Sequence, residues 1–210
     1  MALKAELVAP AHTAVVINEC QRMVVENDAM LPELVRSAAP MLEALGRLVR
    51  AARPAGVQVV HCVVKGRPDG RGGNHNTRMH AVSVKRRAAN PDAAPFDPEA
   101  GSQVATKIGT APEDIVLTRV HGMSPMTDTG LDPLLRNLGV STIVACGVSV
   151  NVGLTNLVMD AVNRSYDVVV PTDGAAGVPV AYAEAVMENT IAMIARLTTT
   201  EELQSLWGAA

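Results

Sequence analysis

Two oppositely charged side chains stand at the ends of apolar runs in this chain. Glu19 follows the β-branched run Thr13–Ile17, and Arg119 closes the run that begins at Asp114. At the carboxyl ends of neighbouring strands, a carboxylate and a guanidinium could form a charge-assisted pair. Such a pair serves either as an acid/base with its electrostatic partner or as a structural salt bridge at a sheet edge. Spacing alone leaves both interpretations open.

Three further polar side chains follow apolar runs in the same way. Gln21 lies just beyond Glu19, His121 lies just beyond Arg119, and His61 is expected at the end of the run 57–64. If these runs are parallel strands, their carboxyl ends meet at one edge of the sheet, where ligands bind in such folds. Gln21 and His121 are therefore predicted to bind substrate.

The segment from Gly147 to Gly153 leads from an apolar run into an amphipathic one. Its glycine spacing does not match the G-x-G-x-x-G dinucleotide fingerprint, so the sequence predicts no nucleotide cofactor there. A tight strand-to-helix turn still directs backbone N–H groups at whatever binds above it, which favours an anion or oxyanion site. Val148, Ser149 and Asn151 are the predicted binding residues of this turn.

Apolar periodicity indicates the elements that must position these residues. Continuous apolar runs, typical of strands covered on both faces, alternate with amphipathic helical patterns. The alternation predicts one doubly wound α/β domain over residues 1–210, with a mostly parallel sheet of about five or six strands and helices on both faces. The predicted strands are 13–17, 57–64, 114–119, 141–146 and 167–170, and the main predicted helices are 40–53, 131–138, 151–164 and 179–197, before a final short helix with a capping box at Thr199 and Glu202.

Residues 65–112 hold many of the glycine, proline and asparagine residues of the chain. The segment is too long for a simple connection in a compact domain, and such loops are usually functional or mobile. A helix is expected over part of 77–89.

Composition narrows the classes of partner. The net charge is -3, and no basic stripe with interleaved aromatics appears, so nucleic acid is not an expected partner. No apolar run reaches the roughly 18 residues that span a bilayer, and no signal peptide is recognised. The three cysteines are odd in number and lie in or beside apolar runs, which predicts reduced thiols in a cytoplasmic protein.

Three segments carry a family resemblance. They are Val15-Val-Ile-Asn-Glu-Cys-Gln21, the stretch from Val116 to Met126, and Val144-Ala-Cys-Gly-Val-Ser-Val-Asn-Val-Gly153. In this order and separation they resemble the isochorismatase-like hydrolase superfamily over nearly the whole chain. The resemblance implies a three-layer α/β fold, a small-molecule substrate and assembly into homodimers or homotetramers, and no cofactor is expected.

The resemblance implies an altered site. The superfamily's cysteine hydrolases use an Asp, a Lys and a Cys, and this chain has Glu19, Arg119 and Gly153 at the matching positions. Isochorismatase-type members also have Gly at the Cys position, and they protonate a vinyl ether without a covalent nucleophile. Arg119 is expected to lower the pKa of Glu19. A metal site of the nicotinamidase kind is not expected, because Val59 stands where that site has an Asp near His61.

Two hypotheses remain. The first is a small-molecule hydrolase that cleaves a vinyl ether or C–N bond without a thiol intermediate. Glu19 is then the acid/base, Arg119 clamps a substrate carboxylate or serves as electrostatic partner, and the turn up to Gly153 positions an oxyanion or water. The second is a catalytically silent family member that binds a small ligand or a protein partner, since fold does not imply function.

Overall fold

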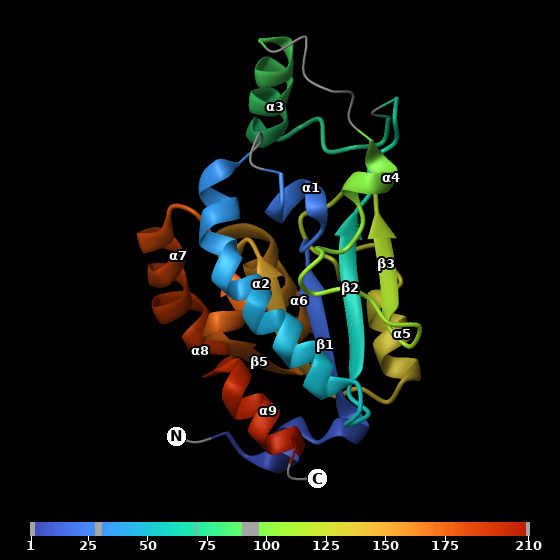
Figure 1. Cartoon of the computed structure of the whole chain (residues 1–210), viewed down its shortest axis with the longest axis vertical. Coiled ribbons are helices and arrows are strands. Elements are labelled where there is room, and N and C mark those ends of the chain that lie inside the picture. Colours follow the sequence, from blue (N-terminus) through green and yellow to red (C-terminus); the bar gives the residue numbers. More distant parts are fainter. Residues whose placement is uncertain (1–2, 28–30, 70, 90–96, 209–210) are drawn as a thin grey trace.

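A parallel sheet lies between two helical layers in the computed structural model, which describes residues 3–27, 31–69, 71–89 and 97–208 (Figure 1). One apolar core lies between the sheet and the helices α2 (Pro32–Ala52) and α9 (Thr200–Gly208). The other lies between the sheet and α5 (Leu131–Asn137), α6 (Thr155–Asn163) and the helical residues 183–191. The predicted doubly wound α/β fold class is confirmed.

The named strands of the described residues all pair in parallel, in the order β3-β2-β1-β4-β5-β7, with β6 beside β4. The strands are β1 (Thr13–Asn18), β2 (Gln58–Val64), β3 (Ile115–Arg119), β4 (Thr142–Val148), β5 (Asp167–Pro171), β6 (Ala175–Ala176) and β7 (Arg196–Thr198). The chain winds outward in one direction from β1 to β3 and in the other from β4 to β7. The winding therefore reverses between β1 and β4, where doubly wound sheets open a crevice at the strands' carboxyl ends.

The remaining helical elements precede or connect these strands. The other α-helices are α1 (Arg22–Val25), α3 (Arg78–Ala88), α4 (Pro98–Gly101), α7 (Val180–Val186) and α8 (Ala192–Ile194). The 3-10 helices are η1 (Ala5–Val8), η2 (Pro10–His12) and η4 (Thr172–Gly174), and the π-helices are η3 (Val150–Leu154) and η5 (Met187–Ile191). None of the helices in the described ranges is both long and apolar enough to cross a membrane.

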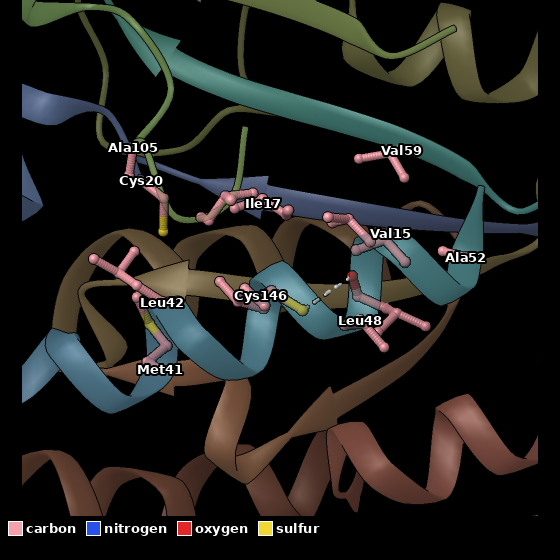
Figure 2. Packing of buried hydrophobic residues seen from close by; sticks show 14 of the residues in the cluster. Val15, Ile17, Cys20, Met41, Leu42, Leu48, Ala52, Val59, Ala105 and Cys146 are labelled. Carbon is pink, nitrogen blue, oxygen red and sulfur yellow. Dashed lines mark hydrogen bonds between the residues drawn. The ribbon is translucent and has the colours of Figure 1, made fainter. Parts of the chain in front are cut away.

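Strand β1 lies in the middle of the sheet, between β2 and β4, and all six of its residues are buried. Its side chains alternate between the two cores, and Figure 2 shows Ile17 facing helix α2, where Leu42 and Leu48 pack. Full burial of each such aliphatic side chain contributes about 1.5–3 kcal/mol. This packing fixes the position of the carboxyl end of β1, where the candidate site lies.

Two predicted helix boundaries are wrong. Helix α2 was expected to begin at Pro40, but it begins at Pro32 and contains Pro40 in its interior. The first two turns are retained because Leu34 and Ala38 are buried in the core. The predicted helix 179–197 instead ends at α8, and the next residues form the short strand β7 beside β5, with Leu197 opposite Val170.

The long segment between β2 and β3 contains helix α3, close to the expected helix, and the short helix α4. Asp97 caps α4 by accepting hydrogen bonds from the N–H groups of Glu99 and Ala100. The part of this segment from 90 to 96 lies outside the described residues. Beyond α4, Val104 forms an isolated antiparallel bridge with Gln21, so the segment returns to the carboxyl end of β1.

Candidate active site

Glu19 is the first residue after β1, and its backbone is left-handed, with φ of 53°. Its N–H donates to the carbonyl of Cys62 on β2 at 2.9 Å, so the neighbouring strand holds this turn in place. Residues other than glycine seldom adopt this conformation, and those that do cluster at functional sites. The Glu19 side chain remains 24% exposed.

Arg119 ends β3, and its guanidinium Nη2 donates to Oε1 of Glu19 across the intervening strand β2. The predicted contact between these two side chains is therefore present. The Arg119 side chain is only 5% exposed, and its Nε and Nη1 are buried with no hydrogen-bond partner among the described residues. Because a buried cationic donor without a partner is costly, the site has unused hydrogen-bonding capacity suited to an anion.

The pKa of the Glu19 carboxyl is raised above its ordinary value of 4.5. Burial raises it because the charged form loses its water, while the charge of Arg119 and the hydrogen bond from Arg119 lower it to a smaller extent. Arg119 therefore lowers this pKa as expected, but burial, which was not anticipated, raises it by more. A raised pKa brings the carboxyl closer to the range in which one group can both give and accept a proton.

Gln21 and His121 are placed differently. Gln21 is fully buried, and its Nε2 donates to the carbonyl of Val64 at 3.2 Å, while its Oε1 is buried without a partner. His121 is exposed, and no hydrogen bond or ion pair among the described residues joins it to Glu19 or Arg119. Gln21 is therefore one of the buried polar side chains beyond β1, whereas His121 is exposed.

The turn after β4 is held by its own side chains. Ser149 donates from Oγ to Asn151 Oδ1 at 2.6 Å, and Asn151 Nδ2 donates to the carbonyl of Val178 at 3.3 Å. The N–H groups of Val152 and Leu154 both donate to the Ser149 carbonyl, at 3.0 and 3.1 Å. Within this turn the two polar side chains therefore anchor the loop before α7, and part of the backbone N–H set is already used.

Gly153 lies in the π-helix η3 against a residue that sequence reasoning did not single out, Asn18. A Cβ at position 153 would lie 2.6 Å from Asn18 Nδ2 and 3.4 Å from the Val148 carbonyl oxygen. Asn18 is fully buried at the end of β1, and its Nδ2 donates to that same carbonyl at 2.7 Å. The one available sequence signal was a polar residue closing an otherwise apolar strand.

The three cysteines of the chain are free and buried. Cys20 and Cys146 lie in the core beneath α2 (Figure 2), and Cys62 lies in the core on the opposite face. Burial raises the pKa of all three thiols, to about 12 for Cys62. Because the thiolate is the nucleophilic form, these side chains behave as core residues.

His61 does not lie at the carboxyl end of β2, which corrects the sequence-based placement. It is in the middle of the strand, and its Nε2 lies 3.1 Å from Oδ2 of Asp114, which precedes β3 at the opposite end of the sheet. Val116 is its partner in the strand register. Among the residues that the structure describes, no group of three or more His, Cys, Asp or Glu side chains could hold a metal ion.

A doubly wound parallel sheet with a charged, partly unsatisfied pair at the carboxyl ends of β1 and β3 defines the class of this α/β protein. The isochorismatase domain model matches residues 13–202, so this chain belongs to the isochorismatase domain family. The family resemblance inferred from the three sequence segments is thereby confirmed.

Curated relatives match part of the chain. The ureidoacrylate amidohydrolase RutB of Methylorubrum extorquens is 29% identical over 154 residues, which cover 66% of this chain and 58% of that protein. The uncharacterized isochorismatase family protein YecD of Escherichia coli O157:H7 is 27% identical over 125 residues, which cover 59% of this chain and 65% of that protein. The chain therefore spans less than two thirds of the length of either relative.

Solved structures share the fold over almost the whole chain. A cysteine hydrolase from Pseudomonas syringae pv. phaseolicola has a TM-score of 0.76 at 24% identity, covering 95% of this chain and 94% of that one. The N-carbamoylsarcosine amidase from Thermoplasma acidophilum has a TM-score of 0.65 at 20% identity, covering 90% and 96%.

Proposed function

We propose that this protein hydrolyses a vinyl ether or C–N bond in a small, carboxylate-bearing molecule without forming a covalent thiol intermediate. The observation that carries the proposal is the contact between Glu19 and Arg119 at the carboxyl ends of β1 and β3. Gly153, with no side chain, lies in η3 against Asn18 at the end of β1. The site thus has an acid/base and a cation, while the cysteines of the chain are buried.

Glu19 is the acid/base in this proposal. Its raised pKa supports a protonated fraction that can donate to a vinyl ether carbon or a leaving nitrogen. The carboxylate that remains then takes a proton from the attacking water. The contact with Arg119 fixes the orientation of the carboxyl group, which matters because small displacements of a reacting group cost much of the rate.

Arg119 is the anion-binding group. One of its nitrogens contacts Glu19, and the two others that are buried and unpartnered are suited to a substrate carboxylate. The names of two similar proteins, a ureidoacrylate amidohydrolase and an N-carbamoylsarcosine amidase, make ureido and N-carbamoyl acids the C–N substrates to test first.

The experiment is turnover by the purified protein on a panel of isochorismate, carboxylated ureides and simple amides, followed by product chromatography. The proposal expects hydrolysis of at least one anionic member and slower hydrolysis of its methyl ester, because the ester removes the charge that Arg119 would bind. Equal rates on the acid and the ester would contradict the role given to Arg119.

A catalytically silent binder is the second candidate, and the departure at all three positions of the family's triad favours it. Its outcome in the same experiment is saturable binding of a panel compound, measured by calorimetry, with no product formed. We also propose a cytoplasmic homodimer or homotetramer, supported by the reduced, unpaired thiols and the family assignment, and testable by light scattering.

A further inference from the structure

Position 153 has no room for a side chain. A Cβ there would lie 2.6 Å from Asn18 Nδ2, closer than real Cβ contacts. The amide could not simply rotate away, because Asn18 is fully buried and its Nδ2 is bonded to the Val148 carbonyl at 2.7 Å. The side chain of residue 18 and a side chain at residue 153 therefore exclude one another.

The hydrogen bond to Val148 also fixes which way the amide of Asn18 faces. Since Nδ2 must face the carbonyl oxygen as donor, Oδ1 is directed away from that carbonyl. Oδ1 is buried and has no partner among the described residues. Buried polar atoms are nearly always hydrogen-bonded, so an acceptor left open in this way indicates a donor that belongs there.

The open acceptor is not isolated in the fold. Four of the five buried side-chain atoms found without a partner in the described residues belong to Asn18, Gln21 and Arg119, around Glu19. The fifth belongs to His61, whose partner Asp114 lies at the opposite end of the sheet. These four unsatisfied atoms, two acceptors and two cationic donors, thus gather where β1 and β3 end.

We propose that Asn18 takes the place of the absent side chain at position 153, filling its space and accepting, at Oδ1, a hydrogen bond from the water that attacks the substrate. The proposal rests on the hydrolysis proposed above. In that step the water oxygen forms the new C–O bond, and the C–N bond or the ether C–O bond to the leaving group then breaks. One water proton passes to the Glu19 carboxylate, where it replaces the proton that Glu19 gives to the leaving nitrogen or to the vinyl ether carbon. Asn18 is a positioning residue for the water and takes no proton itself.

The space-filling half is tested by comparing the wild type with Gly153→Cys, Asn18→Ala and the double variant. Gly153→Cys should lower Tm by roughly 5 °C because of the overlap, and adding Asn18→Ala should recover most of that loss. Iodoacetamide should add one adduct, seen by intact mass, at residue 153 in the double variant and much more slowly in the single one. Equal Tm values for wild type and Gly153→Cys, with equally fast labelling in both thiol variants, would overturn it.

The water-positioning half is tested with Asn18→Leu, which keeps the volume and removes the amide. We expect kcat to fall by about 10²-fold with KM changed less than threefold. The matched control is Thr13→Val at the other end of β1, also a buried polar residue with one hydrogen bond to a carbonyl, and its kcat should stay within about twofold of wild type.

The outcomes separate this inference from the proposed function. An active wild type with an equally active Asn18→Leu would overturn the water role and leave the hydrolase proposal standing. A wild type without turnover on the whole panel would overturn both the hydrolase proposal and the water role. In that case the Tm and labelling comparison still decides whether Asn18 occupies the space of residue 153.

Discussion

Strand β3 has a charged pair at each end, and the two pairs differ in how completely they are satisfied. At the amino end, Asp114 accepts bonds from Arg53 at 2.8 and 3.1 Å, from the N–H of Ala111 at 3.0 Å, and contacts His61 at 3.1 Å. At the carboxyl end, Arg119 contacts Glu19 and keeps two buried nitrogens without partners.

The pKa values of the two carboxyl groups are shifted in opposite directions, in agreement with this difference in hydrogen bonding. Burial alone would raise the pKa of Asp114, but the bonds from Arg53, Ala111 and His61 lower it below its ordinary value. For Glu19 burial prevails over Arg119, and the pKa is raised. The Asp114 carboxylate is fully partnered and only His61 Nδ1 beside it lacks a partner among the described residues, which is typical of a structural pair. At the other end of β3 two nitrogens of the cation itself lack partners, which leaves capacity for a ligand.

The largest effect is expected from substitution of Glu19. Glu19→Gln removes the acid/base and should reduce turnover by about 10²–10⁴-fold, while Tm changes by only a few degrees. Single-turnover kinetics and thermal unfolding on the same preparations measure both. If activity persists and stability collapses, the pair is structural and the contrast between the two ends of β3 disappears.

Asp114→Asn should show the converse. It removes the charge that Arg53 and His61 share, and breaking such a buried pair costs about 3–5 kcal/mol of unfolding free energy. Urea unfolding measures this loss. The kcat of the protein that remains folded should equal that of wild type, and a selective loss of kcat would mean that this end of the sheet also serves the reaction.

Arg119→Lys sharpens the role of the open donors. Lysine keeps the charge but loses the planar set of N–H groups, so KM for an anionic substrate should rise by about tenfold, with a smaller change in kcat. Arg53→Lys is the matched control at the other end of β3, and it should lower unfolding free energy without changing KM. Steady-state kinetics on both variants measure these changes. An unchanged KM in Arg119→Lys would contradict the anion-binding role of Arg119.

His61 gives a pH dependence to the structural end. Burial lowers its pKa below 6.5 although Asp114 opposes the shift, so the unfolded chain binds a proton that the folded chain does not. Stability should therefore fall as pH drops below about 6.5, by about 1 kcal/mol between pH 7.5 and 5.5. Urea unfolding at the two pH values should show a smaller drop for His61→Gln, whose amide retains a donor to Asp114; an identical drop would assign the effect elsewhere.

The smallest expected effect is that of thiol alkylation. Iodoacetamide should leave native turnover unchanged and label Cys20, Cys62 and Cys146 only after unfolding, because all three are buried with raised pKa values. Intact mass and residual activity measured on the same samples provide the test. Inactivation accompanied by a single adduct in the folded state would show that one of these thiols participates in the reaction.

The central strands and the contact between Glu19 and Arg119 were predictable from sequence. Continuous apolar runs mark strands covered on both faces, and their alternation with helices forces parallel order, which brings the residues after β1 and β3 to one edge. Strand β7 was not predictable from sequence. Its three residues continue the apolar pattern of the helix that precedes them, and they form a strand only because they pair with β5.

The remaining features depend on contacts between distant residues. His61 lies within an apolar run, and nothing nearby in the sequence indicates toward which end of the sheet its side chain makes contacts. Its partner Asp114 is 53 residues away. The effect of Asn18 on Gly153 requires β1 and β4 to be in register, with Asn18 beside Gly147. The net direction of the Glu19 pKa shift depends on burial, which a single sequence does not specify at a loop position.

Because the backbone of Glu19 is left-handed, selection for stability and selection for activity favour different residues at this position. Glycine, asparagine and aspartate adopt this conformation more readily than glutamate, so mutational drift under selection for stability alone favours them at position 19. None of them reaches as far as the glutamate that meets Arg119. A population evolved for heat resistance without selection for activity would therefore be expected to lose this carboxylate early, while the core residues beneath α2 persist.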